Sequence, residues 1–188
     1  MTNFDNSTYY HYKLIFNSKM SPATRRLLFA LFLVCLATVF LFLIQLYTFY
    51  RIPPQKTEVI LLQILIALLL TPIYHHLFHG IAYLTLGLSA KMQVSDTLIG
   101  IPIPKWHSDA MLTRRQHTYI LLSPFFLGTG ILLLLMAFFP SFWYVSAAIL
   151  AIHLPSCVPD LYWAWNLRKL HPTSVIRSAK HGFNVYKI

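Results

Sequence analysis

Four long apolar runs, separated by short polar segments, dominate the chain. They cover residues 27–50, 58–88, 117–139 and 142–167. As α-helices rising about 1.5 Å per residue, each is long enough to cross a hydrocarbon core of about 30 Å. Typical helix-start signals precede two of the runs, namely Ser21-Pro22 and Thr113-x-x-Gln116. The pattern predicts an all-α membrane protein, in which residues 27–167 form a bundle of four transmembrane helices.

Polar segments flank and connect these runs. The N-terminal arm, residues 1–26, and the C-terminal tail, residues 168–188, contain no apolar run long enough to span a bilayer. The longest internal connection, residues 89–116, holds an alternating stretch at 91–95 and an apolar stretch at 99–104 that Gly and Pro interrupt. This pattern fits either a short β-hairpin on the membrane surface or an irregular connector.

Composition supports a membrane protein. Of the 188 residues, 57% are hydrophobic and 11% are charged, whereas about 25% of residues are charged in soluble domains. The formal net charge of +10 does not indicate nucleic-acid binding, because the basic residues are spread between the apolar runs. The expected partner is the lipid bilayer. Cys35 and Cys157 both lie within apolar runs, which argues against a disulfide framework.

The positions of Lys and Arg predict the orientation. Four lie in the N-terminal arm, four in the connection between the second and third runs, and five in the tail. Only Arg51 and Lys56 lie between the first and second runs. Basic residues accumulate on the cytoplasmic side of membrane proteins. We therefore expect a multi-pass protein of the cell membrane with both termini in the cytoplasm.

The second run contains a cluster of histidines. His75, His76 and His79 fall within five residues. On a helix, side chains four apart share a face, so His75 and His79 have the spacing that binds zinc in the H-E-x-x-H motif. His76 occupies the position at which that motif has its glutamate.

Asp160 is the acidic residue that lies well inside an apolar run. A carboxylate there costs a few kcal/mol or more unless it is paired, protonated or bound to a metal. His75 lies 17 residues after Glu58, and Asp160 lies 18 residues after Phe142. Both are thus about 25 Å from the outer helix end. Two imidazole nitrogens, one carboxylate oxygen and a water are a typical catalytic zinc site. We predict zinc at His75, His79 and Asp160.

Other residues are weaker candidates for metal ligands. Cys157 precedes Asp160 by three residues and is a reserve ligand. His153 is assigned to packing, because two prolines separate it from Asp160. Interhelical hydrogen bonding remains the alternative for the whole histidine cluster. The histidines outside the apolar interior are assigned to solvated loops or interfaces: His107, His117, His171 and His181.

These motifs together resemble the putative zincin peptidase family of small bacterial membrane proteins, whose layout is related to that of site-2-protease-type intramembrane metalloproteases. The matching segments are His75-x-x-x-His79-Gly80, Thr113-Arg114-Arg115-Gln116, Leu122-Ser123-Pro124-Phe125, Pro159-Asp160-Leu161 and Lys180-His181-Gly182-Phe183-Asn184-Val185-Tyr186. The resemblance implies that His75, His79 and Asp160 hold zinc. It also implies hydrolysis of peptide bonds near the membrane face.

The chain departs from this family at position 76. The resemblance implies a glutamate there, which acts as general base on water, whereas this chain has His76. An imidazole can also act as a base near neutral pH, so His76 is the candidate catalytic residue.

Three functions remain open. The first is a membrane-embedded zinc metalloprotease acting on a membrane protein or peptide. The second is a catalytically silent relative that binds such a protein as a scaffold or regulator. The third is a histidine-rich redox protein. A di-iron centre would need more histidine clusters than the chain has, and haem would need His153 as the facing ligand.

Overall fold

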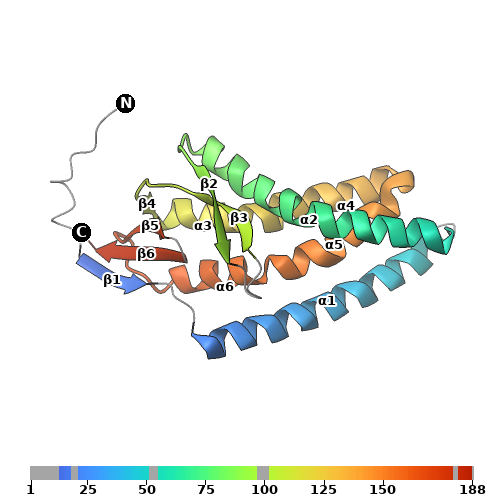
Figure 1. The fold of residues 1–188 in the computed structure, drawn as a ribbon, viewed down its shortest axis with the longest axis horizontal. Coiled ribbons are helices and arrows are strands. Elements are labelled where there is room, and N and C mark those ends of the chain that lie inside the picture. The colour runs from blue at the N-terminus through green and yellow to red at the C-terminus, as the bar shows by residue number, and fades with distance from the viewer. Residues whose placement is uncertain (1–12, 18–20, 51–54, 97–101, 180–181, 188) are drawn as a thin grey trace.

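The computed structural model describes residues 13–17, 21–50, 55–96, 102–179 and 182–187. This part of the chain is mostly helical (Figure 1). The first two spans are single helices, α1 (Pro22–Tyr50) and α2 (Thr57–Thr85). The third is built from α3 (Arg114–Ser123), a π-helical turn η2 (Pro124–Gly128) and α4 (Thr129–Phe138). A 3₁₀ turn η3 (Pro140–Phe142) leads to the fourth span, α5 (Trp143–Ser156) and α6 (Val158–Leu167).

These four helical segments are long and apolar enough to cross a membrane, which confirms the predicted number of spans. Many of their large apolar side chains point outward, for example Leu41, Leu69 and Phe138, which are 62%, 66% and 72% exposed. Such a surface suits lipid rather than water. The fold is therefore that of a multi-pass membrane protein.

Local sequence explains where the helices begin and end. The backbone N–H of Thr24 donates to Ser21 Oγ at 3.1 Å, which caps α1. Thr113 and Gln116 form the predicted capping box at the start of α3. Helix α2 ends before Gly87, whose φ of 66° lies in the left-handed region that glycine adopts without strain.

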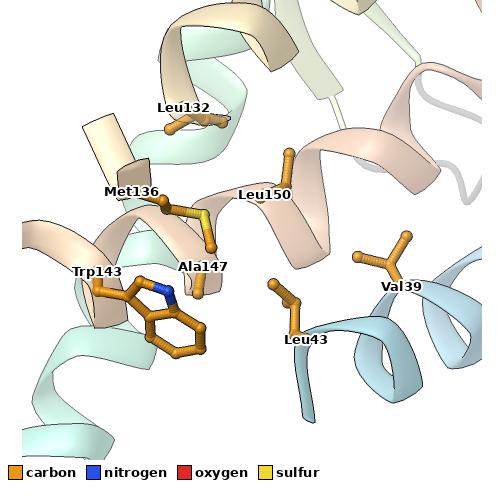
Figure 2. Close-up of a cluster of buried hydrophobic side chains, with 7 residues drawn as sticks. All are labelled: Val39, Leu43, Leu132, Met136, Trp143, Ala147 and Leu150. Atoms are coloured by element: carbon orange, nitrogen blue, oxygen red, sulfur yellow. The ribbon is translucent and has the colours of Figure 1, made fainter. Parts of the chain in front are cut away.

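The helices pack around α5, which contacts α1, α2 and α4. A buried apolar cluster joins three of these helices (Figure 2). It contains Val39 and Leu43 of α1, Leu132 and Met136 of α4, and Trp143, Ala147 and Leu150 of α5.

The predicted four-helix bundle is present, but the protein is not purely α-helical, because two small sheets accompany the helices. Strands β2 (Lys91–Asp96) and β3 (Pro102–His107) form an antiparallel hairpin, so the hairpin alternative for this connection is confirmed. A four-stranded antiparallel sheet has the order β1-β6-β5-β4. Its strands are β1 (Lys13–Asn17), β4 (Leu112–Thr113), β5 (Val175–Ala179) and β6 (Gly182–Lys187).

The four-stranded sheet combines the N-terminal arm, the connection before α3 and the C-terminal tail at one end of the bundle (Figure 1). It is stabilised by Ile176, Phe183 and Val185, which are buried together with Leu167 of α6. Burial of these side chains explains why segments with no long apolar run are ordered next to the helices.

Candidate metal centre

Helices α2 and α6 bring the three predicted zinc ligands together. His75 Nε2 lies 3.0 Å from Asp160 Oδ2, and His79 Nε2 lies 3.4 Å from the same oxygen. The side chains are 9%, 12% and 17% exposed for His75, His79 and Asp160 respectively. We call these three residues the α2–α6 cluster.

Local helix geometry explains this arrangement. His75 and His79 are four residues apart on α2, so their rings meet edge to face with centroids 5.0 Å apart. Asp160 lies in the first turn of α6, immediately after the helix breaks at Cys157. A carboxylate in the first turn of a helix is also favoured by the positive end of the helix dipole.

A hydrogen bond outside the cluster determines which nitrogen His79 presents to Asp160. The ring places Nδ1 2.8 Å from the carbonyl oxygen of Ile120. A carbonyl can only accept, so Nδ1 carries the proton and a neutral His79 has its lone pair on Nε2. That lone pair faces a carboxylate oxygen at 3.4 Å. Two acceptors facing each other in a membrane span require a cation between them, either a proton or a metal ion.

The distances fit zinc. With Zn–N and Zn–O bonds of about 2.0–2.2 Å in a tetrahedron, the nitrogen and oxygen ligands lie about 3.4 Å apart. The two observed nitrogen–oxygen distances are 3.0 and 3.4 Å. The outer hydrogen bond from His79 to Ile120 is also typical of histidines that bind metals. The donor set and its surroundings therefore suit a zinc ion.

His76 lies beside both histidine ligands of the cluster. Its ring centroid is 5.4 Å from that of His75 and 5.8 Å from that of His79, and the side chain is buried. Its backbone oxygen accepts a hydrogen bond from Trp106 Nε1 at 2.8 Å. This bond does not involve the imidazole. Catalysis by His76 stays a prediction.

His153 lies closer to the α2–α6 cluster than the sequence predicts. This residue is fully buried, and its Nε2 lies 3.0 Å from Pro124 O. Its ring contacts Tyr74 and His75 at centroid distances of 5.3 and 5.4 Å. It therefore packs, as predicted, but it packs directly against the α2–α6 cluster. The direct contact between the His75 and His153 rings leaves no space for a porphyrin, which argues against haem bound by this pair.

The assignment of His117 to a solvated position is wrong. His117 lies on α3 and is only 6% exposed, because Phe183 of β6 covers it with ring centroids 5.0 Å apart. Neither ring nitrogen has a hydrogen-bond partner among the described residues. The capping box that ends one residue earlier was the sequence signal that His117 belongs to a helix.

Two of the remaining histidines, His107 and His171, lie outside the α2–α6 cluster. His171 is exposed, as predicted, and its Nδ1 lies 2.8 Å from the Thr173 hydroxyl. His107 is partly buried and lies 3.5 Å from Asp109. His181 lies outside the described residues.

The β2–β3 hairpin contacts α2 at the histidine motif. The indole of Trp106 lies against Gly80, where a Cβ atom would come within 2.7 Å of the ring. Only glycine permits this close approach. Together with the hydrogen bond to His76 O, the contact fixes the hairpin next to the α2–α6 cluster.

Replacing Gly80 by alanine should therefore destabilise the protein by about 1–3 kcal/mol, because the rigid indole must shift to make room. Gly130 of α4 is the matched control, since a Cβ there meets no atom within 4 Å. Gly130→Ala should be neutral or slightly stabilising, as alanine favours helices. Thermal unfolding in detergent measures the stability change of each variant. Equal effects of the two variants would contradict the close approach of Trp106.

Comparison with known proteins supports the resemblance seen in the sequence. A family model described as a putative zincin peptidase matches residues 68–175, which is more than half of the chain. The matched region includes all three residues of the α2–α6 cluster. No curated protein and no solved structure gave a match.

Proposed function

Since the chain belongs to the putative zincin peptidase family, we propose that it is a membrane-embedded zinc metalloprotease-like protein. Its zinc would be held by His75, His79 and Asp160. Its substrate would be a membrane protein or peptide. The observation that carries this proposal is the convergence of two imidazole nitrogens on one buried carboxylate oxygen, at 3.0 and 3.4 Å.

Each residue of the site has a separate task in this proposal. Bound zinc would supply Lewis acidity, which polarises a carbonyl group and activates water as a nucleophile. His75 and His79 hold the ion, and the carbonyl of Ile120 keeps Nε2 of His79 free of a proton. His76, which lies next to both rings, would accept a proton from the attacking water.

A second candidate function is favoured by one observation, the histidine at position 76. If imidazole cannot replace the motif glutamate, the protein is a catalytically silent relative. It would then use the same fold to bind a membrane protein or peptide as a scaffold or regulator. This candidate keeps the metal site and loses only the hydrolysis.

Purified full-length protein, with any affinity tag removed, separates these candidates. Zinc content is measured by mass spectrometry, and hydrolysis is measured on a labelled single-span peptide in detergent micelles. Zinc together with cleavage that Asp160→Asn abolishes would support the protease. Zinc without cleavage would support the silent relative. A chain that binds no zinc would contradict both.

For the orientation, we propose that both termini are cytoplasmic. Two observations support this proposal, the unequal distribution of Lys and Arg and the pairing of β1 with β6. Reporter fusions at Lys56 and after Ile188 should report opposite sides of the membrane. Reporters on the same side would contradict the arrangement. A third fusion within residues 97–101 serves as the control, since it should match the fusion after Ile188.

A further inference from the structure

A second group of metal-ligating side chains lies next to the α2–α6 cluster, on the other side of His75. Cys157 Sγ lies 3.8 Å from His75 Nδ1 and 3.8 Å from His153 Nε2. One ligand atom from each of these three residues lies within 4.8 Å of the others. Cys157 and His153 are fully buried, and His75 is buried as well. We call these residues the thiol cluster.

The spacing within the thiol cluster matches that of metal ligands. A tetrahedral ion with a Zn–S bond of about 2.3 Å and a Zn–N bond of about 2.0–2.1 Å places sulfur and nitrogen about 3.6 Å apart. Both observed sulfur–nitrogen distances are 3.8 Å. Little change in these two distances would therefore be needed for the sulfur and each nitrogen to bind one ion.

His75 belongs to both clusters through different nitrogens. Its Nε2 faces Asp160, and its Nδ1 faces Cys157. The two nitrogens of an imidazole point in divergent directions, so the ring can bind one ion on each side when it loses its proton. Asp160 as carboxylate, Cys157 as thiolate and His75 as imidazolate would then partly neutralise the two ions. Such neutralisation is needed within a membrane span.

The surroundings fix the ring of His153, with Nε2 donating a hydrogen bond that a metal ion would have to replace. Nε2 lies close to the Pro124 carbonyl in the π-helical turn η2, at 3.0 Å. A Cβ on Gly128 would come within 2.8 Å of the same nitrogen, so only glycine at this position avoids a clash with the ring. His153 Nδ1 is buried and has no hydrogen-bond partner among the described residues. Binding a metal through Nε2 would transfer the ring proton to Nδ1 and release the carbonyl of Pro124.

We propose that His75, His153 and Cys157 form a second metal site, which binds a thiolate-seeking divalent ion such as zinc and shares His75 with the α2–α6 cluster. Thiolate sulfur is a soft ligand that selects zinc over the hard ions magnesium and calcium. The thiol of Cys157 would lose its proton when the ion binds. The site goes beyond the proposed function, because it requires no hydrolysis.

Cobalt(II) is a suitable probe, because a thiolate ligand gives it a near-ultraviolet charge-transfer band that nitrogen and oxygen ligands do not. Full-length, tag-free protein is stripped of metal in detergent and titrated with cobalt(II). Wild type should bind about two ions per chain and show the band. Cys157→Ser should bind about one ion and lack the band. His153→Ala should also bind about one ion, with the band weakened or lost.

Two further variants make the result specific. His79→Ala, which removes a ligand from the α2–α6 cluster alone, should bind about one ion and keep the band. Cys35→Ser is the matched control, since it removes the other thiol of the chain. It should change neither the number of bound cobalt ions nor the charge-transfer band. Circular dichroism and a single symmetric elution peak show that each variant is folded.

Several outcomes would overturn the second site. One is wild-type protein that binds cobalt without the charge-transfer band, which would leave the α2–α6 cluster and the proposed function intact. Another is a band that survives in Cys157→Ser. A third is a band lost in folded His79→Ala, which would place the thiol on the same ion as Asp160. Protein that binds no cobalt and no zinc would overturn the second site and the proposed function together.

Discussion

Replacing Asp160 by asparagine is expected to weaken zinc binding at the α2–α6 cluster by more than about 100-fold. In other zinc sites, loss of a group that merely orients a ligand costs about 10–100-fold, and here a direct ligand is lost. Asp160 is also the only anion of the cluster, and both histidine nitrogens face its Oδ2. An asparagine leaves the dication in a membrane span without a counter-charge.

The loss of zinc binding in Asp160→Asn should also reduce the stability that zinc gives to the folded protein. Zinc that binds only the folded state stabilises it by about 2.7 kcal/mol when its concentration is 100 times the dissociation constant. Removal of zinc with a chelator should therefore lower the unfolding temperature of wild type and have a smaller effect on Asp160→Asn. The zinc content of Asp160→Asn should be about one ion per chain below that of wild type.

Matched controls come from residues of the same type outside the site. Asp109 is an exposed aspartate that lies 3.5 Å from both His107 and Arg177. His171 is exposed beside Thr173. Asp109→Asn and His171→Ala should keep the full zinc content. If Asp160→Asn kept it too, the cluster would be a set of interhelical hydrogen bonds, the alternative that the sequence left open for these histidines.

The spans and the α2–α6 cluster could be predicted for the same physical reason. A bilayer of fixed thickness requires apolar runs of a minimum length, and it also gives all helices a common depth scale. Spacing placed His75 and His79 on one face, and depth placed Asp160 level with them. Sequence could not show that α2 and α6 are neighbours, because lateral packing depends on side-chain fit between helices.

The four-stranded sheet could not be predicted, because its pairing is non-local. Strand β1 pairs with β6, which joins the two ends of the chain. The strands are two to six residues long, so each is too short for a clear alternating pattern. In β6, for example, Phe183 and Val185 are the two side chains known to be buried.

The surroundings of His117 and His153 could not be predicted from the sequence, for related reasons. His117 was placed at the edge of a span, but α3 begins at Arg114 and β6 covers the ring. His153 was assigned to packing because two prolines separate it from Asp160, and it does pack, but against the ring of His75. Pro155 instead lies within α5, and the helix breaks only at Cys157, so His153 stays on the side of α5 that faces His75.

Replacing His76 by glutamate is expected to raise hydrolysis of a membrane peptide by about 10²–10⁴-fold, the usual contribution of a general base. We expect wild type to show little or no hydrolysis. The new carboxylate would lie beside both histidine ligands, because the ring of His76 already does. The backbone oxygen of residue 76, which binds Trp106, is unaffected by the substitution. Bound zinc would offset the added negative charge in the span.

His76→Gln is the matched control, because glutamine has the shape of glutamate and cannot accept a proton at neutral pH. Both variants must retain zinc for the comparison to count. Faster hydrolysis with glutamate, and no faster hydrolysis with glutamine, would show that the protein lacks activity only because the general base is missing. No gain with glutamate, in a protein that still holds zinc, would support the scaffold or regulator. Wild-type cleavage that His76→Ala abolishes would show instead that the imidazole of His76 is the base, and that this chain performs zincin chemistry with histidine in place of glutamate.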